Sequence, residues 1–251
     1  MQSSVIDNQY QKLLEDLADL NQLKQVVNHA FKREFEVLEL YSDSQEPEEI
    51  VSREAFGFDN PFTGKLEKYA FRTATIEELK LLTYWHKNSQ YCWLLMSAYE
   101  KFEKFLTSSY FEATGKCSRT LSPMLSYFSD SFPDVKTREA KNKFGINLRV
   151  AVHLVEKMRH AIAHDQGLVP DATEFTGRVI KQSGIGNDRK LHEEFVSQFI
   201  VENKVFILEV PANNHPILKT FHDQYRILVS YLISYAYLVK DAASQSSMQN
   251  V

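Results

Sequence analysis

One continuous stretch decides the fold, and it consists of Val152-His153-Leu154-Val155-Glu156-Lys157-Met158-Arg159-His160-Ala161-Ile162-Ala163-His164-Asp165-Gln166-Gly167. At helical spacing its apolar residues form one stripe together with a residue just upstream: Leu148, Val152, Val155, Met158 and Ile162. Gly167 and the following Pro170 are typical of a helix end. The pattern therefore predicts the last turns of an amphipathic helix that ends at Gly167.

Two kinds of polar side chain make this helix a candidate for a functional site. Arg159 lies about 40° from the centre of the apolar stripe when successive residues are placed 100° apart. Its guanidinium keeps its charge and is costly to bury without an anionic partner. His153, His160 and His164 lie on roughly the opposite face. An arginine beside the core, followed five residues later by a histidine at the helix end, indicates a site.

The order of Arg159, a polar residue, three further residues and His164 resembles the R-x4-H motif of the HEPN superfamily. Members of that all-helical superfamily include metal-independent endoribonucleases of toxin–antitoxin, abortive-infection and other phage-defence systems. The resemblance covers about residues 75 to 241 and implies RNA as the substrate. It also implies a homodimer in which two copies of the motif share one cleft. Glu100 would then be an acidic partner of Arg159 and His164, as in some HEPN nucleases.

The motif suits cleavage of RNA without a metal, in which the 2′-hydroxyl attacks the adjacent phosphate. Histidine is suited to the proton transfers because its reference pKa of about 6.5 is close to working pH. Arginine is suited to phosphate because its planar fork donates two parallel hydrogen bonds and stays charged. We therefore assign Arg159 to phosphate binding and transition-state stabilisation, and His164 to proton transfer. His160 would orient the substrate or a partner, and Glu100 would hold Arg159 or His164 in place.

The spacing of the motif raises a geometric difficulty. Five residues of a regular helix turn by about 140° net, so Arg159 and His164 do not project side by side. Either the helix loosens near Ala163, or the site is assembled across a two-fold dimer. The resemblance implies the dimer, which would also double the local positive charge.

Other interpretations of these residues remain open. His153, His160 and His164 share a face and could hold a metal, but the chain has no His-Glu-x-x-His motif and no supporting cysteines, so we expect neither a metal nor a cofactor. Glu100 could instead form an exposed ion pair with Lys104. The main alternative to an enzyme is a non-catalytic HEPN-like module that binds RNA or a protein.

The composition describes a folded chain, with 43% hydrophobic and 25% charged residues over 251 positions. No run approaches the roughly 20 apolar residues of a membrane span, and the N-terminus lacks a basic-then-apolar signal peptide. The two cysteines, Cys92 and Cys117, make neither a disulfide framework nor a Cys-x-x-Cys pair. We therefore expect a cytoplasmic protein with reduced thiols and no membrane partner.

The net charge of −4 argues against a general affinity for polyanions, because proteins of that kind usually carry a basic face. RNA binding would require a local cluster, and one precedes the motif: Lys136, Arg138, Lys141, Lys143 and Arg149. The alternative is that these are ordinary solvated charges of a helix.

Residues 1–74 lie outside the resemblance, and we expect them to form an appendage of helix and loop. Apolar residues recur at helical spacing over residues 9–40, with Asp7 as the expected N-cap. The turn-rich segment 56–64 carries three phenylalanines, whose rings we expect to pack back onto the bundle. This appendage could dock an antitoxin or another regulatory protein.

Residues 75–241 are expected to form a mainly α, HEPN-like helical bundle with an inserted β-hairpin. Thr75 and Glu78 have the spacing of a capping box at the start of a long helix. The motif helix is expected over residues 137–164, with Gly145 as a candidate interruption.

Loop signals at residues 176–177 and 183–188 follow the motif helix. The hairpin is expected at about residues 195–211, with Glu202-Asn203 as its turn. Asn214 is the expected N-cap of a final helix that includes Pro216 and Phe221, and the Ser/Gln-rich residues 242–251 are expected to form a flexible tail.

Overall fold

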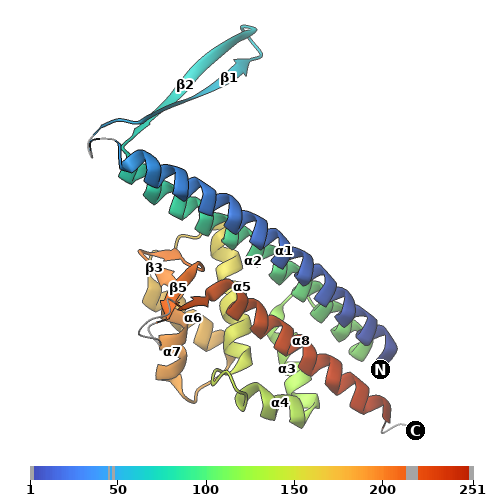
Figure 1. Cartoon of the computed structure of the whole chain (residues 1–251). Helices are drawn as coiled ribbons and strands as arrows, with labels where there is room; N and C mark the ends of the chain where they lie inside the picture. Colours follow the sequence, from blue (N-terminus) through green and yellow to red (C-terminus); the bar gives the residue numbers. More distant parts are fainter. Residues whose placement is uncertain (1–2, 45, 47–48, 213–219, 249–251) are drawn as a thin grey trace. The chain divides into compact units, whose positions relative to one another are not determined.

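The computed structural model describes residues 3–44, 46, 49–212 and 220–248, and this part of the chain is mainly helical, as predicted (Figure 1). Its elements in chain order are α1 (Ser3–Ser42), β1 (Ser52–Asn60), β2 (Lys65–Ala74), α2 (Ile76–Thr114), α3 (Leu121–Ser131), α4 (Pro133–Ala140), α5 (Leu148–Asp165), α6 (Ala172–Ser183), α7 (Arg189–Ser197), β3 (Ile200–Val201), β4 (Lys204–Val205), β5 (Glu209–Ala212), β6 (Thr220–Asp223) and α8 (Gln224–Met248). The strands form the antiparallel pairs β1–β2, β3–β4 and β5–β6. Contacts divide the chain into a larger unit, residues 1–24 and 90–251, and a smaller unit, residues 25–89.

The larger unit is packed around α5, which contacts α4, α6, α8 and β4. Val150, Val152 and Leu154 are fully buried, although they point to different sides of the helix. The first half of α5 is therefore apolar all round rather than along one stripe. Asn147 is its N-cap, and the side chain accepts a hydrogen bond from the backbone N–H of Arg149.

The helix predicted over residues 137–164 is divided into α4 and α5, which end and begin at Ala140 and Leu148. Gly145 lies between them with a φ of 72°, a left-handed conformation that glycine adopts without a Cβ penalty. The candidate interruption at Gly145 is therefore confirmed.

The part of α1 from Ser3 to Lys24 contributes to the core of the larger unit. Ile6 and Leu13 are buried, and the ring of Tyr10 lies edge-on to that of Phe105, with 6.1 Å between centroids. The division between compact units thus does not coincide with the boundary predicted at residue 74. Asp7 lies within α1, so its predicted role as the N-cap is wrong.

The smaller unit contains a hairpin, β1–β2, where a loop was predicted. The turn is shaped by Asn60, whose Oδ1 accepts hydrogen bonds from the backbone N–H groups of Phe62 and Thr63 at 2.8 and 3.4 Å. Phe62 is 95% exposed, so the predicted packing of its ring is wrong, and Phe58 is 38% exposed. Phe62 lies in the turn between β1 and β2, where its ring is exposed to solvent. The side chain of Phe56 lies outside the described part of the chain.

Two predictions that depend on neighbouring residues are confirmed. In the capping box the Thr75 N–H donates to Glu78 Oε2 at 2.8 Å, and the Glu78 N–H donates to Thr75 Oγ1 at 3.3 Å. Glu202 and Asn203, with φ values of 49° and 59°, form the two-residue turn between β3 and β4. This hairpin is shorter than predicted, because each strand has two residues.

The segment after α5 is more helical than predicted. Thr176 and Gly177 lie inside α6, not in a loop. Of the loop predicted at residues 183–188, Ser183 is the last residue of α6, and residues 184–188 connect α6 to α7. Phe175 and Val179 are buried one turn apart on α6. Their burial offsets the roughly 1 kcal/mol by which a glycine disfavours a helix.

The final helix, α8, begins later and ends later than predicted. Phe221, expected in that helix, lies in β6 instead. The expected cap Asn214 and first-turn Pro216 lie outside the described residues. The helix continues to Met248 and Ala242 is buried, whereas a flexible tail was predicted for residues 242–251.

Candidate functional site

The motif residues Arg159, His160 and His164 lie on the last turns of α5. The helix remains regular through Asp165 and ends at Gln166, which has a φ of 53°. The backbone N–H of Gly167 donates to the Ala161 carbonyl at 2.9 Å, which closes the helix end. The helix therefore does not loosen near Ala163, and Arg159 and His164 of one chain project about 140° apart.

The two motif histidines form a pair on the surface. Both His160 and His164 are exposed, and their ring centroids are 4.5 Å apart with an angle of 55° between the planes. Residues four apart share a helix face, so the pair follows directly from the sequence spacing. The structure thus brings His160 and His164 together but does not pair either of them with Arg159.

The guanidinium of Arg159 is half-buried, and its Nε is buried without a hydrogen-bond partner. No carboxylate of the described residues forms an ion pair with it within 4.0 Å. A buried donor without a partner typically costs about 1–3 kcal/mol. Arg159 is therefore a positive charge that no described residue neutralises by direct contact.

The charge of Arg159 acts on the pKa of Glu103, which lies on α2. The predicted acidic partner was Glu100. Burial raises the pKa of Glu103, and the charges of Glu156 and Glu100 raise it further, while Arg159 opposes them. Glu100 is exposed, forms no ion pair with Lys104 in the described structure, and lines a shallow pocket of about 390 Å³ beside Glu103. Its predicted role in holding the motif is not supported by a direct contact.

Sequence periodicity could not distinguish these two acids, because Glu100 and Glu103 both lie off the apolar face of their helix. Only the tertiary structure distinguishes the two acids, because it buries part of Glu103 and leaves Glu100 exposed. The difference in burial between Glu103 and Glu100 would have identified the right acid, but burial is known only from the structure.

We call Tyr99, Glu103, His153, Glu156 and Arg159 the α2–α5 polar cluster, because charges or hydrogen bonds of other members contribute to the pKa values of Tyr99, Glu103 and Glu156. His153 is fully buried, and its Nδ1 donates to Glu156 Oε2 at 3.1 Å. Burial alone would raise the pKa of Glu156, but the hydrogen bond from His153 and the charge of Lys157 outweigh it, and the pKa is lowered. Burial, Glu156 and Glu103 raise the pKa of Tyr99, whose hydroxyl has no partner.

The burial of His153 also decides against a three-histidine metal site. His153 points into the core and is bonded to Glu156, whereas His160 and His164 are exposed. Over the residues that the structure describes, no group of three or more His, Cys, Asp or Glu side chains could hold a metal ion.

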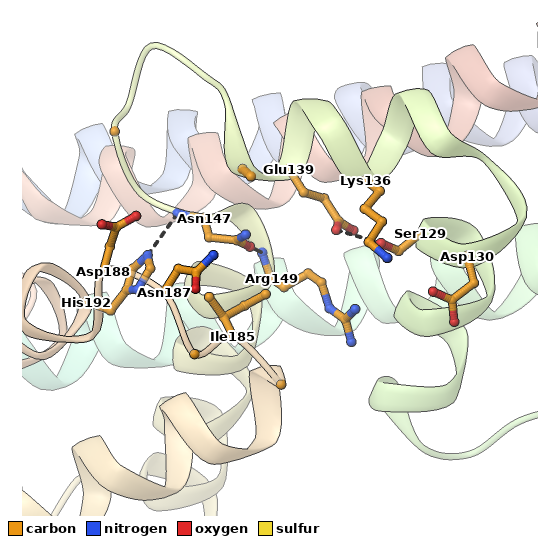
Figure 2. A pocket seen from close by; sticks show the side chains of 14 residues that line it. Ser129, Asp130, Lys136, Glu139, Asn147, Arg149, Ile185, Asn187, Asp188 and His192 are labelled. Carbon is orange, nitrogen blue, oxygen red and sulfur yellow. Dashed lines mark hydrogen bonds between the residues drawn. The ribbon is translucent and has the colours of Figure 1, made fainter.

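The basic cluster predicted upstream of the motif is dispersed. Arg138 forms ion pairs with Asp134 at 3.2 Å and Asp241 at 2.6 Å. Lys136 and Arg149 instead line a pocket of about 400 Å³ that also contains acidic residues, including Asp130, Glu139 and Asp188 (Figure 2). Mixed charge of this kind does not make a general phosphate-binding face.

Several polar groups in this pocket have protein partners, although Arg149 Nε and His192 Nδ1 are buried without a hydrogen-bond partner among the described residues. Ser129 Oγ and the Tyr235 hydroxyl each donate to the buried Glu139 at 2.9 Å (Figure 2 shows Ser129). The backbone N–H of Asn147 donates to His192 Nε2 at 3.3 Å. Burial raises the pKa of Glu139 and lowers that of His192. These contacts join α3, α4, α7 and α8 around the start of α5, which is a structural role.

Comparisons with protein-family models, curated proteins and solved structures found no match for this chain. Within the described ranges, no helix combines the length and apolarity needed to cross a membrane.

Proposed function

We propose that this chain is a metal-independent endoribonuclease of a toxin or phage-defence system, with Arg159 and His164 as its catalytic residues. The observation that carries the proposal is the state of Arg159, which is half-buried and has no ion-pair partner among the described residues. It lies on the helix end that also carries the exposed pair His160 and His164. A permanent charge held in this way is suited to a ligand phosphate.

In the proposed reaction, a 2′-hydroxyl of RNA loses its proton to an imidazole and attacks the adjacent phosphorus. The bond to the 5′-oxygen breaks, and that oxygen receives a proton from a second imidazole. The products are a 2′,3′-cyclic phosphate and a 5′-hydroxyl. The guanidinium stabilises the dianionic phosphorane, and His160 orients the RNA.

The regular geometry of α5 favours a site made from two chains. Because Arg159 and His164 project about 140° apart on one helix, a second copy is needed to place both groups on one phosphate. Two copies of His164 would supply the base and the acid, and two copies of Arg159 would double the positive charge. The added positive charge would also offset the negative charge of the nearby carboxyl groups of Glu103 and Glu156.

The proposal is tested by incubating single-stranded RNA with the full chain in the presence of a chelator. We expect cleavage with cyclic phosphate ends, which Arg159→Ala and His164→Ala abolish with little change in melting temperature. Arg178→Ala is the matched control for loss of an arginine. The Arg178 side chain is 59% exposed and, among the described residues, forms an ion pair only with Glu174 on its own helix. His29→Ala, at an exposed position of α1, is the histidine control.

The same assay separates the enzyme from the alternative, a non-catalytic RNA- or protein-binding module. RNA binding that survives both motif substitutions, with no cleavage at any protein concentration, would favour the binding module. A common loss of folding in both variants would identify Arg159 and His164 as structural residues.

A further inference from the structure

The smaller unit exposes an apolar stripe along α1. Val26, Ala30, Arg33, Val37 and Leu40 recur at alternating spacings of four and three residues, and all five are exposed. Val26 is 59% and Leu40 72% exposed. We call this set the α1 stripe. Leu38, on the face that packs into the unit, is buried, and at 100° per residue the stripe is centred about 110–130° away from it.

The spacing of the residues in the α1 stripe indicates which kind of partner structure fits against it. Alternating steps of four and three residues give a 3.5-residue repeat, the seam of a coiled coil. A seam of this kind packs its side chains into the holes of a facing helix. The occupant of the stripe is therefore a helix with the same repeat.

The order of residues along the stripe identifies that helix. From Leu23, three residues before Val26, the seam contains leucine, valine, alanine, arginine, valine and leucine, the last being Leu40. Apart from the alanine and arginine at its centre, this order is the same in both directions. We propose that the α1 stripe docks antiparallel against the α1 stripe of a second copy of this chain.

An antiparallel pairing matches every layer of the seam. Val26 of one copy faces Val37 of the other, and Leu40 faces the residue three before Val26, which is Leu23. Ala30 faces Arg33, so the smallest side chain leaves room for the longest. A two-fold axis at the centre makes the interface self-complementary, as isologous dimers require.

The charges beside the stripe are compatible with this pairing. The Arg33 Nε donates only to the backbone carbonyl of His29, at 3.4 Å, within its own helix. Glu34 and Glu36 are exposed on the two flanks of the stripe. In an antiparallel pair the second copy's Arg33 lies opposite Ala30, about 6 Å along the helix axis from Glu34 and about 9 Å from Glu36, so both carboxylates contribute an attractive charge at longer range.

The first test measures the mass of the full chain by sedimentation over a range of concentrations. We expect Val37→Glu to halve the mass of the assembly, or to weaken its association at least tenfold, without lowering the melting temperature. Gln25→Glu is the matched control, since it adds the same charge to α1 at an exposed position outside the stripe. A native chain and a Val37→Glu chain of equal mass at every concentration would overturn the proposal.

The second test determines the direction of pairing, in a Cys117→Ser background that removes the exposed cysteine. A mixture of Ala30→Cys and Arg33→Cys chains should form a mixed disulfide, while Ala30→Cys alone should form little dimer. Efficient cross-linking of Ala30→Cys alone would indicate parallel pairing and contradict the proposal, as would no cross-linking at all. The test does not depend on the motif, so failure of the nuclease proposal would leave its outcome unaffected.

Discussion

The imidazole rings of His160 and His164 lie 4.5 Å apart, one turn from each other on the exposed end of α5. The proposed reaction gives these rings different roles. Because His164 moves protons, His164→Ala should abolish cleavage even at saturating RNA. Because His160 orients the RNA, His160→Ala should raise KM several-fold and leave kcat close to the native value. Steady-state kinetics on a defined oligonucleotide measures both. An equal loss of kcat in the two variants would contradict this division of roles.

Arg159→Lys separates the charge of the guanidinium from its geometry. Lysine retains the positive charge but lacks the planar fork that donates two parallel hydrogen bonds to phosphate. Removing one donor to a developing oxyanion typically costs about 100- to 1000-fold in kcat. We therefore expect Arg159→Lys to lose activity on that scale while the melting temperature changes little. Near-native cleavage by this variant would show that charge alone is sufficient.

Glu103→Gln should stabilise the fold at neutral pH more than at acidic pH. Burial raises the pKa of Glu103, so the folded chain holds this proton at a pH where the unfolded chain has released it. The contribution of Glu103 to folding stability is thus fully present below its unfolded pKa and is lost as pH rises through the folded value. Urea unfolding of both chains at pH 4 and pH 7 measures the difference. A greater benefit at pH 4 would contradict the direction of the shift.

The sequence predicts this structure best where an element is specified by neighbouring residues. Thr75 and Glu78 cap α2 through their own side chains, and Glu202-Asn203 turns the β3–β4 hairpin through its own backbone. Such features need no tertiary information. The end of α5 belongs partly to the same class. Gly167 was predicted to end the helix and is left-handed, but the residue before it, Gln166, is the C-cap and is left-handed as well.

Tertiary packing decides the features that the sequence did not predict. His153 shares a helix face with His160 and His164 in the sequence, but α5 is surrounded on all sides near His153 and only partly near its end. The charge of Arg159 on α5 lowers the pKa of Glu103 on α2, partly offsetting the effect of burial, and the periodicity of neither helix predicts this influence. For the same reason the predicted partner was Glu100, the more exposed of two acids on one helix.

Lys24 is a further residue whose role only the structure reveals, and it gives the last prediction. It is 3% exposed on α1, forms ion pairs with Asp223 and with Glu209, the latter at 3.6 Å, and lies over the rings of Tyr91 and Tyr225. Removing one partner of a buried ion pair typically costs about 3–5 kcal/mol, and the partial exposure of both carboxylates reduces this. We therefore expect Lys24→Met to lower the free energy of unfolding by about 2–3 kcal/mol.

The control for Lys24 is Lys12→Met on the same helix. Lys12 is 68% exposed and pairs only with Asp16, four residues away at 3.5 Å, so its loss should cost less than about 0.5 kcal/mol. Urea unfolding compares the two variants, and the double variant Lys24→Met/Asp223→Asn should recover part of the loss, because it removes a carboxylate left without its partner. Equal effects of Lys24→Met and Lys12→Met would mean that the buried lysine is not held by these charges. The two carboxylates would then be satisfied by solvent, and the link between α1 and the β5–β6 hairpin would depend on packing alone.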